Sequence, residues 1–329
     1  MRITNSMLVA NYMNNMQRNL ANMSTVQNQL SSGKTISRAS ENPYIAVRTM
    51  QLNSEIAANK QYNSNITDTT NWLDTTDTAL GQANNIIARI KELTVKAGNG
   101  SYSEDEIGAI KDEVVEKIKE FGQVLNTSFD GNYIFGGTKS TSKPIKVDDD
   151  GNISYLSKEG NTLQPNDNIV KNQIGAQLKT EISDGVTVQY NKTAVDILNY
   201  KDSKNNDASV IDTLKNLVTQ LDIASDKSST EDAKKNALSE LSGKLTEDIT
   251  AIGANISKLR SNVGAMQNRM ESAKATNEDQ NYNMTSILSS TDDIDFAEKT
   301  MEYSVLQTVY IATLQTSSKV LQNTLLDYV

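Results

Sequence analysis

The chain has 329 residues, of which 37% are hydrophobic and 5% aromatic, and this length is sufficient for about two domains. It contains no cysteine and no histidine, which excludes disulfides, thiolate nucleophiles, Ser-His-Asp triads and histidine-ligated zinc. The net charge of −9 argues against a nucleic-acid partner held by bulk electrostatics.

The start of the chain has no apolar segment of the kind that directs secretion. Met1–Ser6 lead into a polar, asparagine-rich stretch, so we expect no cleaved secretory signal peptide. A run of about 18 apolar residues occurs nowhere in the sequence, and we therefore expect no membrane insertion.

The first predicted helix carries an apolar seam at heptad spacing and ends near Ser31–Lys34. The residues of the seam are Val9, Met13, Met16, Leu20, Met23 and Leu30. Such a seam is typical of a helix that supercoils with a partner. Because a glycine-containing break follows this helix, two alternatives stay open, packing within the chain and packing against another chain.

Two more helices follow. The second is predicted from about Pro43 to Ala97, with Gly98 after its end. The third begins with a capping box formed by Ser103 and Glu106. Its apolar stripe consists of Ile107, Ile110, Val114, Ile118, Phe121 and Leu125. We interpret the stripes of these two helices as intramolecular core.

Between about residues 133 and 200, heptads give way to apolar alternation around turn sequences. Asp148–Asn152 and Ser183–Gly185 each contain Asp-Gly, which readily adopts the positive φ of a tight turn. These segments predict two β-hairpins. We interpret residues 139–204 as a small inserted β-domain and expect it beyond the ends of the helices.

Helices resume at about residue 210, and the longest periodic run in the chain follows. It comprises Leu238, Leu241, Leu245, Ile249, Ile252, Ile256, Leu259, Val263, Met266 and Met270. A helix from about Glu231 to Ala275 would be roughly 65 Å long, which suits an elongated bundle. The C-terminal segment has another apolar face, formed by Met301, Val305, Leu306, Val309, Tyr310, Leu314 and Leu321.

These elements predict a mainly α fold: an elongated antiparallel coiled coil or helical bundle built from both chain ends, with a small inserted β-domain. Residues 1–50 carry a net charge of +4 and residues 281–329 one of −4, which favours pairing of the two ends. We divide the chain into a terminal polymerisation segment, a helical rod and the β-domain. Their bounds are 1–40 plus 285–329, 41–138 plus 205–284, and 139–204. A single pair of terminal helices buries little apolar surface to offset the entropy lost on ordering. We therefore expect both ends to become ordered only against neighbouring copies.

The sequence offers no catalytic, cofactor or metal constellation. Asp148–Asn152 lacks the ligand spacing of an EF-hand, and Gly131–Thr138 lacks the ending of a phosphate-binding loop. Asp292, Asp293 and Asp295 form an acidic cluster with no basic neighbour in sequence. We interpret these acids as residues of a first helical turn, where negative charge complements the helix dipole.

Several motifs resemble those of bacterial flagellins and their hook-associated relatives. The resemblance covers about residues 1–138 and 205–329. The segments that carry it are Ser31–Ile36, Ala39–Pro43, Leu93–Gly100, Val263–Glu271 and Ile294–Glu298. Glu41–Asn42 replaces the two aspartates that usually precede the proline in this family.

Two further segments distinguish members of this superfamily. Gly131–Thr138 and Leu325–Val329 resemble the proteins that join the flagellar hook to the filament. Gln267–Glu271 is at least as similar to flagellin. Of the two possibilities we favour a junction subunit, and flagellin, the filament subunit, is the alternative. A cytosolic coiled-coil scaffold is the alternative of another class.

The resemblance implies a structural subunit without catalysis or cofactor. It implies export through the flagellar type III channel and a place in the extracellular flagellum. The implied partners are further copies in a ring or helical assembly, a neighbouring hook-associated junction protein, filament-side subunits and a cytoplasmic export chaperone. A central zinc protease, as some flagellins carry, is excluded because the chain has no histidine.

We assign candidate site residues on this basis. The self-assembly seam comprises Val9, Met13, Met16, Leu20, Met23, Leu30, Met301, Val305, Leu306, Val309, Tyr310, Leu314, Leu321 and Leu325. By resemblance, the export chaperone would contact Leu306, Tyr310, Leu314, Leu321 and Leu325.

Overall fold

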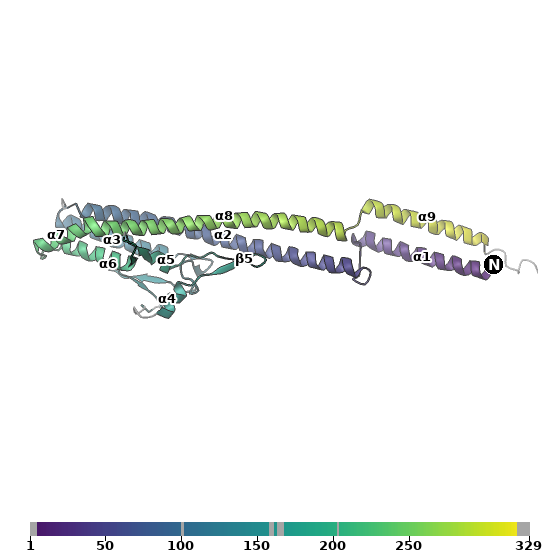
Figure 1. The fold of residues 1–329 in the computed structure, drawn as a ribbon, viewed down its shortest axis with the longest axis horizontal. Helices are drawn as coiled ribbons and strands as arrows, with labels where there is room; N and C mark the ends of the chain where they lie inside the picture. Colours follow the sequence, from purple (N-terminus) through teal and green to yellow (C-terminus); the bar gives the residue numbers. More distant parts are fainter. Residues whose placement is uncertain (1–4, 100–101, 158–160, 163–167, 203, 321–329) are drawn as a thin grey trace, which may run out of the picture. The chain divides into compact units, whose positions relative to one another are not determined.

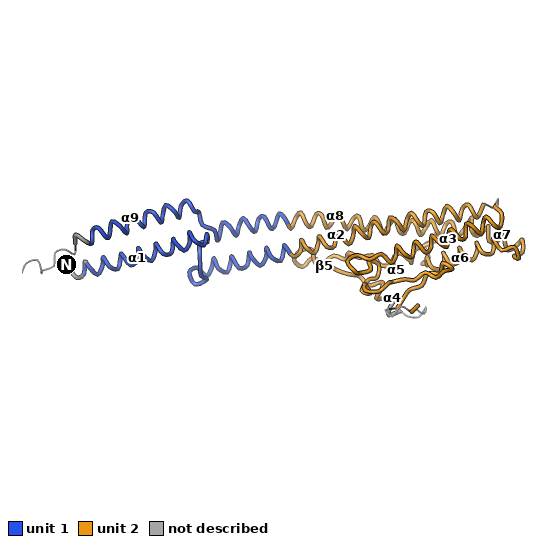
Figure 2. Tube along the Cα trace, turned by 180° about the vertical axis from the view of Figure 1, so that it is seen from behind, with its two compact units in different colours: residues 1–60, 278–329 blue, residues 61–277 orange. Residues whose placement is uncertain are grey.

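The computed structural model describes residues 5–99, 102–157, 161–162, 168–202 and 204–320 (Figure 1). The chain divides into two compact units (Figure 2). The first consists of residues 1–60 and 278–329, and the second of residues 61–277. Two long helices, α2 (Pro43–Ala97) and α8 (Thr246–Asp292), contribute to both units.

The first unit pairs the two chain ends. Its other helices are α1 (Asn5–Ser32) and α9 (Phe296–Val320), which run antiparallel side by side. The Tyr12 hydroxyl donates a hydrogen bond of 2.8 Å to the carbonyl oxygen of Thr313. The Asn19 amide donates to the carbonyl oxygen of Leu306 at 3.4 Å. The predicted pairing of the chain ends is confirmed for the described residues.

The boundary between α1 and α2 follows the predicted break. Gly33 ends α1 with a φ of +73°, and its N–H donates to the carbonyl oxygen of Gln29 at 2.8 Å. Asn42 caps α2, because its side-chain oxygen accepts from the Ile45 N–H at 3.3 Å. Pro43 occupies the first helical position, where its missing N–H has no cost.

The second unit is a helical bundle with a β-containing insertion. Its helices besides α2 and α8 are α3 (Glu104–Leu125), α6 (Val210–Ser225) and α7 (Glu231–Glu240). A π-helical turn (Leu241–Leu245) connects α7 to α8. Arg260 on α8 forms a bidentate ion pair with Asp77 on α2, with N···O distances of 2.8 and 3.0 Å.

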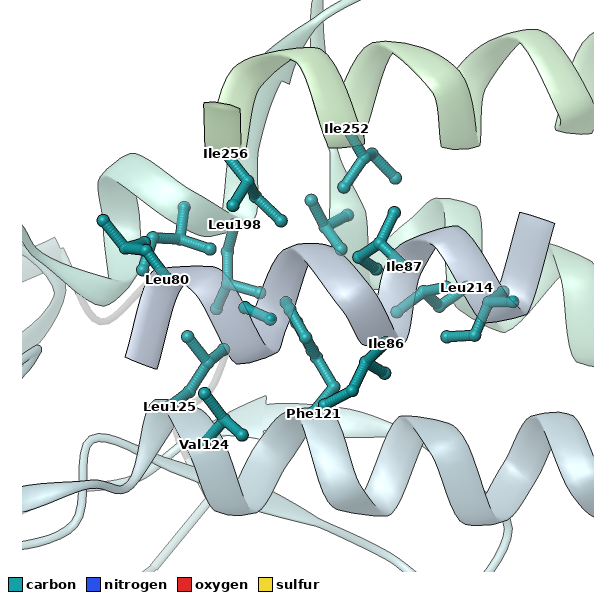
Figure 3. Close-up of a cluster of buried hydrophobic side chains, with 14 of the residues drawn as sticks. Leu80, Ile86, Ile87, Phe121, Val124, Leu125, Leu198, Leu214, Ile252 and Ile256 are labelled. Carbon is teal, nitrogen blue, oxygen red and sulfur yellow. The ribbon is translucent and has the colours of Figure 1, made fainter. Parts of the chain in front are cut away.

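One hydrophobic core runs through this unit, and its members come from the predicted stripes. Leu80, Ile86 and Ile87 on α2 lie between Phe121 on α3 and Ile252 on α8 (Figure 3). The capping box at Ser103 is present, and the stripe of α3 is buried except for the half-buried Ile110. The interpretation of these stripes as intramolecular core is confirmed in the second unit.

In the described residues, the region between α3 and α6 contains four separate two-stranded antiparallel hairpins, one of which lies before residue 139 and one of which ends after residue 204. The strands are β1 (Ser128–Phe129), β2 (Asn132–Tyr133), β3 (Ile145–Val147), β4 (Ile153–Tyr155), β5 (Lys179–Ser183), β6 (Val186–Gln189), β7 (Asn199–Lys201) and β8 (Asp207–Ser209). Two short helices, α4 (Asn168–Ile174) and α5 (Ala194–Leu198), accompany them. The two predicted hairpins are confirmed as β3–β4 and β5–β6, with Gly151 and Gly185 at positive φ in their turns.

The expectation that the strands lie beyond the ends of the helices is wrong. Within the second unit they lie along the side of α2 and α8 (Figure 1). Asn277 on α8 donates to the carbonyl oxygen of Ile182 at 2.8 Å, and Asn255 donates to that of Asn199 at 3.2 Å. An isolated two-stranded hairpin is marginal in water, so each hairpin needs the helices as part of its core.

The predicted end of the helix with the longest periodic run is also wrong, because α8 continues past Ala275 to Asp292. After Met270 the apolar spacing stops, and asparagines take over inward positions. Asn277 is 2% exposed and is held by its bond to Ile182. An amide with a hydrogen-bond partner can occupy a buried position that apolar periodicity does not reveal. No helix in the described ranges combines the length and hydropathy that a bilayer span requires.

We expect Phe121→Ala to destabilise the second unit by about 3–5 kcal/mol, since the ring is fully buried between α2 and α3. The matched control is Tyr102→Ala, because that ring is 39% exposed. Urea unfolding followed by circular dichroism measures both variants. Equal midpoints for the two variants would contradict this core.

Candidate assembly surface

The predicted seam of α1 divides into two faces. One face turns toward α9, and its side chains are half-buried or buried at alternating spacings of three and four. They are Val9, Tyr12, Met16, Asn19, Met23, Val26 and Leu30. The other predicted residues, Met13 and Leu20, are 47% and 37% exposed. Packing on α9 therefore uses four of the six predicted residues and leaves two in solvent.

The same division occurs on α9. Leu306 and Tyr310 are half-buried against α1, together with Tyr303 and Thr313. The other predicted residues of α9 within the described part are exposed: Met301, Val305, Val309 and Leu314. Leu321 and Leu325 lie outside the described residues.

Sequence reasoning missed Tyr12 and Asn19 as contacts of α9. Both residues lie between the predicted seam positions, and both bond to backbone carbonyls of α9. Their spacing of seven was the available signal, but an apolar pattern does not register an asparagine.

Exposed apolar side chains concentrate in the first unit. Of the 17 large hydrophobic residues that are exposed in the described part of the chain, only Val95, Tyr102 and Val186 belong to the second unit. Those of the first unit, besides the residues of α1 and α9, include Tyr44, Val47 and Met50 on α2 and Tyr282 and Ile287 on α8. Phe296, Met301 and Val305 line a shallow apolar groove on α9. Apolar exposure of this extent is typical of an interaction surface.

A clasp joins the segment that follows α1 to the end of α8. We use this name for Lys34, Asp292 and Asp293 with the backbone around them. The Lys34 ammonium lies 3.0 Å from Asp292 Oδ2 and 2.7 Å from Asp293 Oδ1. The backbones also pair, since the Thr35 N–H donates to the Asp292 carbonyl oxygen at 2.6 Å.

The interpretation of the acidic cluster as part of a first helical turn is therefore wrong for Asp292 and Asp293. Asp292 is the last residue of α8, Asp293 lies in the connection that follows, and both contact Lys34, a basic residue 258 positions or more away in sequence. Only Asp295 acts at a helix start, where its Oδ1 accepts from the Ala297 and Glu298 N–H groups. The opposite charges of the two chain ends were the sequence signal for the clasp.

The ion pairs hold the clasp in its charged state. Hydrogen bonds from Lys34 and Ser289 lower the pKa of Asp293 below its ordinary value of 3.8. Bonds to Asp293 and Asp292 raise the pKa of Lys34 above its ordinary value of 10.5. Both groups therefore remain charged throughout the neutral range.

Both ends of the chain match known protein families. Residues 3–140 match the bacterial flagellin N-terminal helical region, and residues 246–329 match the bacterial flagellin C-terminal helical region. Together the two matches span more than half of the chain. The chain belongs to the flagellin family. The exposed apolar side chains of the first unit lie on helices inside the two matched regions of this flagellin-family chain.

The relatives and solved structures agree with this family. The chain is 30% identical over 129 residues to the flagellar filament 41 kDa core protein of Borreliella burgdorferi, and the match covers 39% of this chain and 38% of that protein. The chain therefore spans less than half the length of this relative. A flagellar hook associated protein-3 from Legionella pneumophila has the same fold, with a TM-score of 0.60, 15% identity and coverage of 73% of this chain and 98% of that one. The flagellar junction protein FlgL from Legionella pneumophila also has this fold, with a TM-score of 0.54 and 16% identity. The match covers 76% of this chain and 100% of that one.

Within the described ranges, no group of three or more acidic side chains is placed to hold a metal ion. The surface of this flagellin-family chain instead offers apolar side chains on helices.

The clasp predicts a pH dependence. The clasp contributes fully to the stability of the folded state above pH 3.8, where the aspartate of the unfolded chain is charged. This contribution is lost as the pH falls through the pKa of Asp293 in the folded state, which lies below 3.8. The raised pKa of Lys34 places the alkaline loss above pH 10.5. We expect Lys34→Gln to speed amide exchange in residues 290–300 by up to about fivefold at pH 7, since an exposed pair contributes at most about 1 kcal/mol.

Hydrogen exchange with mass spectrometry, comparing both proteins at the same pH, measures this effect. The difference should shrink below pH 4. Lys117→Gln breaks an exposed pair in the second unit and serves as the control. An equal effect of both substitutions on residues 290–300 would be evidence against the clasp.

Proposed function

We propose that this chain is a structural subunit of the bacterial flagellum that joins the hook to the filament and has no enzymatic activity. The observation that carries this proposal is the exposed apolar face of α1 and α9, on helices that match the flagellin family. The junction role is supported by the fold shared with solved hook-associated and junction proteins. It is also supported by the resemblance of Gly131–Thr138 to junction proteins.

The terminal helices are the polymerisation segment in this proposal. Residues 1–40 and 285–329 pack against the same helices of neighbouring copies, the helical rod follows, and residues 139–204 project outward. Met13 and Leu20 on α1 and Met301, Val305 and Val309 on α9 supply the contacts between copies. Burying such side chains contributes roughly 25 cal/mol per Å² of apolar area.

The export route follows from the same surface. In our proposal the subunit leaves through the flagellar type III channel, without a cleaved signal peptide, and functions outside the cell. A cytoplasmic chaperone covers Leu306, Tyr310 and Leu314 before export, together with Leu321 and Leu325. Because Leu306 and Tyr310 turn toward α1 in the folded chain, the chaperone must displace α1 to reach them. Its further partners are a neighbouring hook-associated junction protein and filament-side subunits.

Flagellin itself is the second candidate. The identity of 30% to a flagellar filament core protein favours it. A filament subunit would use the same apolar face but would add copies without limit. A cytosolic coiled-coil scaffold would instead keep its chain ends folded in isolation.

We expect Val305→Ser with Val309→Ser to abolish incorporation into flagella while changing the free energy of unfolding by less than about 0.5 kcal/mol, because both side chains are exposed. The matched control is Val95→Ser with Val186→Ser, which alters two exposed valines of the second unit. Motility and electron microscopy of complemented cells provide the readout. Normal incorporation of the first variant would contradict the proposed contact face.

Seeded assembly distinguishes the candidates. Purified protein is mixed with hook or filament fragments and examined by electron microscopy, with limited proteolysis of the free protein alongside. A junction subunit should add to hook ends without elongating, and a protease should trim residues 1–40 and 285–329. Long tubular filaments would establish flagellin instead, and resistant chain ends would favour the scaffold.

A further inference from the structure

A pocket of the second unit is lined by aromatic rings from three separate elements. It has a volume of about 610 Å³, which lies in the range of sites for small organic ligands. Trp72 comes from α2, Phe129 from β1 and Tyr190 from the residue after β6. Trp72 is the one tryptophan of the chain. The pocket takes no part in the contacts between copies that we propose above.

Phe129 and Tyr190 both stand at right angles to Trp72. The ring plane of Phe129 makes an angle of 85° with that of Trp72, and the ring centroids are 6.2 Å apart. For Tyr190 the angle is 87° and the centroid distance 5.9 Å. Because perpendicular rings turn their faces in different directions, they can contact one ligand group from several sides. The π electrons make each face negative, so such a set of faces attracts a cation.

The indole of Trp72 is not fixed by a hydrogen bond. Its Nε1–H is buried, and within the described part of the chain it donates to no acceptor. A buried donor without a partner is destabilising, and a phenylalanine at this position would avoid that cost. Tryptophan differs from phenylalanine in having the aromatic face that binds cations best. The residue type therefore indicates a role for the face of this ring.

The amides of the lining are already engaged within the chain. The Asn65 amide donates to the carbonyl oxygen of Glu181 at 3.2 Å and accepts from Gln61 at 3.0 Å. The side-chain oxygen of Asn132 accepts from the Ser140 hydroxyl at 2.9 Å. A sugar needs several uncommitted hydrogen-bonding groups in its site. This lining therefore suits a sugar poorly, although aromatic rings are present.

Three charged side chains complete the lining. Asp68, Asp130 and Lys179 are exposed, and in the described ranges their side chains form no hydrogen bond or ion pair. Two carboxylates and one ammonium group leave a net charge of −1, which matches one monovalent cation. A primary ammonium group is strongly hydrated and would lose that water against aromatic rings. A quaternary ammonium group is covered by methyl groups and suits both the rings and the charge.

We propose that this pocket binds a quaternary ammonium group of a small organic cation such as choline. The methyl groups pack against the faces of Trp72, Phe129 and Tyr190, and the carboxylates of Asp68 and Asp130 balance the positive charge. The site lies entirely on the second unit and does not depend on the flagellar role proposed above.

The emission of Trp72 tests this proposal, because the chain has no other tryptophan. We expect choline chloride to change this emission saturably at constant ionic strength. The matched ligand is 3,3-dimethyl-1-butanol, which has the shape of choline with a carbon in place of the charged nitrogen. It should bind at least about tenfold more weakly, since it lacks the attraction between the cation and the rings. Isothermal titration calorimetry repeats both titrations.

Asp68→Asn with Asp130→Asn should weaken choline binding by about tenfold, because both carboxylates are lost. The fold should be kept, since both side chains are exposed and asparagine readily adopts the φ of +49° that Asp130 has in the β1–β2 turn. The matched control is Asp150→Asn with Asp184→Asn, which makes the same change of charge at two exposed Asp-Gly turns outside the pocket. Thermal unfolding of both variants checks the fold.

Three outcomes would overturn the proposal. Equal binding of choline and the neutral alcohol would show that the pocket does not recognise the charge. Equal choline affinity of the two double variants would show that Asp68 and Asp130 do not contribute. The absence of saturable choline binding in both fluorescence and calorimetry would exclude the site.

Discussion

The terminal helices carry more apolar surface than one pair of helices can bury. Two helices in contact cover one stripe on each partner. On α9 that stripe contains Leu306 and Tyr310, and Met301, Val305 and Val309 remain in solvent. A monomer with these helices leaves apolar faces exposed to water, which favours the contacts between copies that we propose. The concentration of exposed apolar side chains in the first unit follows from the same constraint.

Polar interactions set the register of this pairing. Because an apolar seam can slide by a heptad at modest cost, the seam alone leaves the alignment of α1 and α9 open. Tyr12 and Asn19 bond to particular carbonyls of α9, and Lys34 contacts two aspartates where α8 ends. An exposed ion pair adds little stability, but it excludes shifted alignments that would leave Lys34 without its acids.

The second unit has the opposite character, since its apolar side chains are consumed within the chain. The hairpins of the insertion are too small to hold a core of their own and share that of the helices, where Ile182 and Tyr200 belong to the same cluster as Leu80 and Ile252.

The sequence by itself determined the long helices apart from the end of α8, the cap at Ser103 and the turns of two hairpins, because these depend on local spacing and on residues such as Ser103 and Gly151. Its motifs also pointed to the flagellin family. Only the tertiary structure decided which half of each seam is covered, because Met13 and Met16 have equal hydrophobic character and differ only in where α9 lies. It alone decided that α8 continues through Asn277, and that Lys34 meets Asp292 and Asp293. These features join residues that lie from 95 to more than 250 positions apart, and local sequence patterns do not show which distant segments meet.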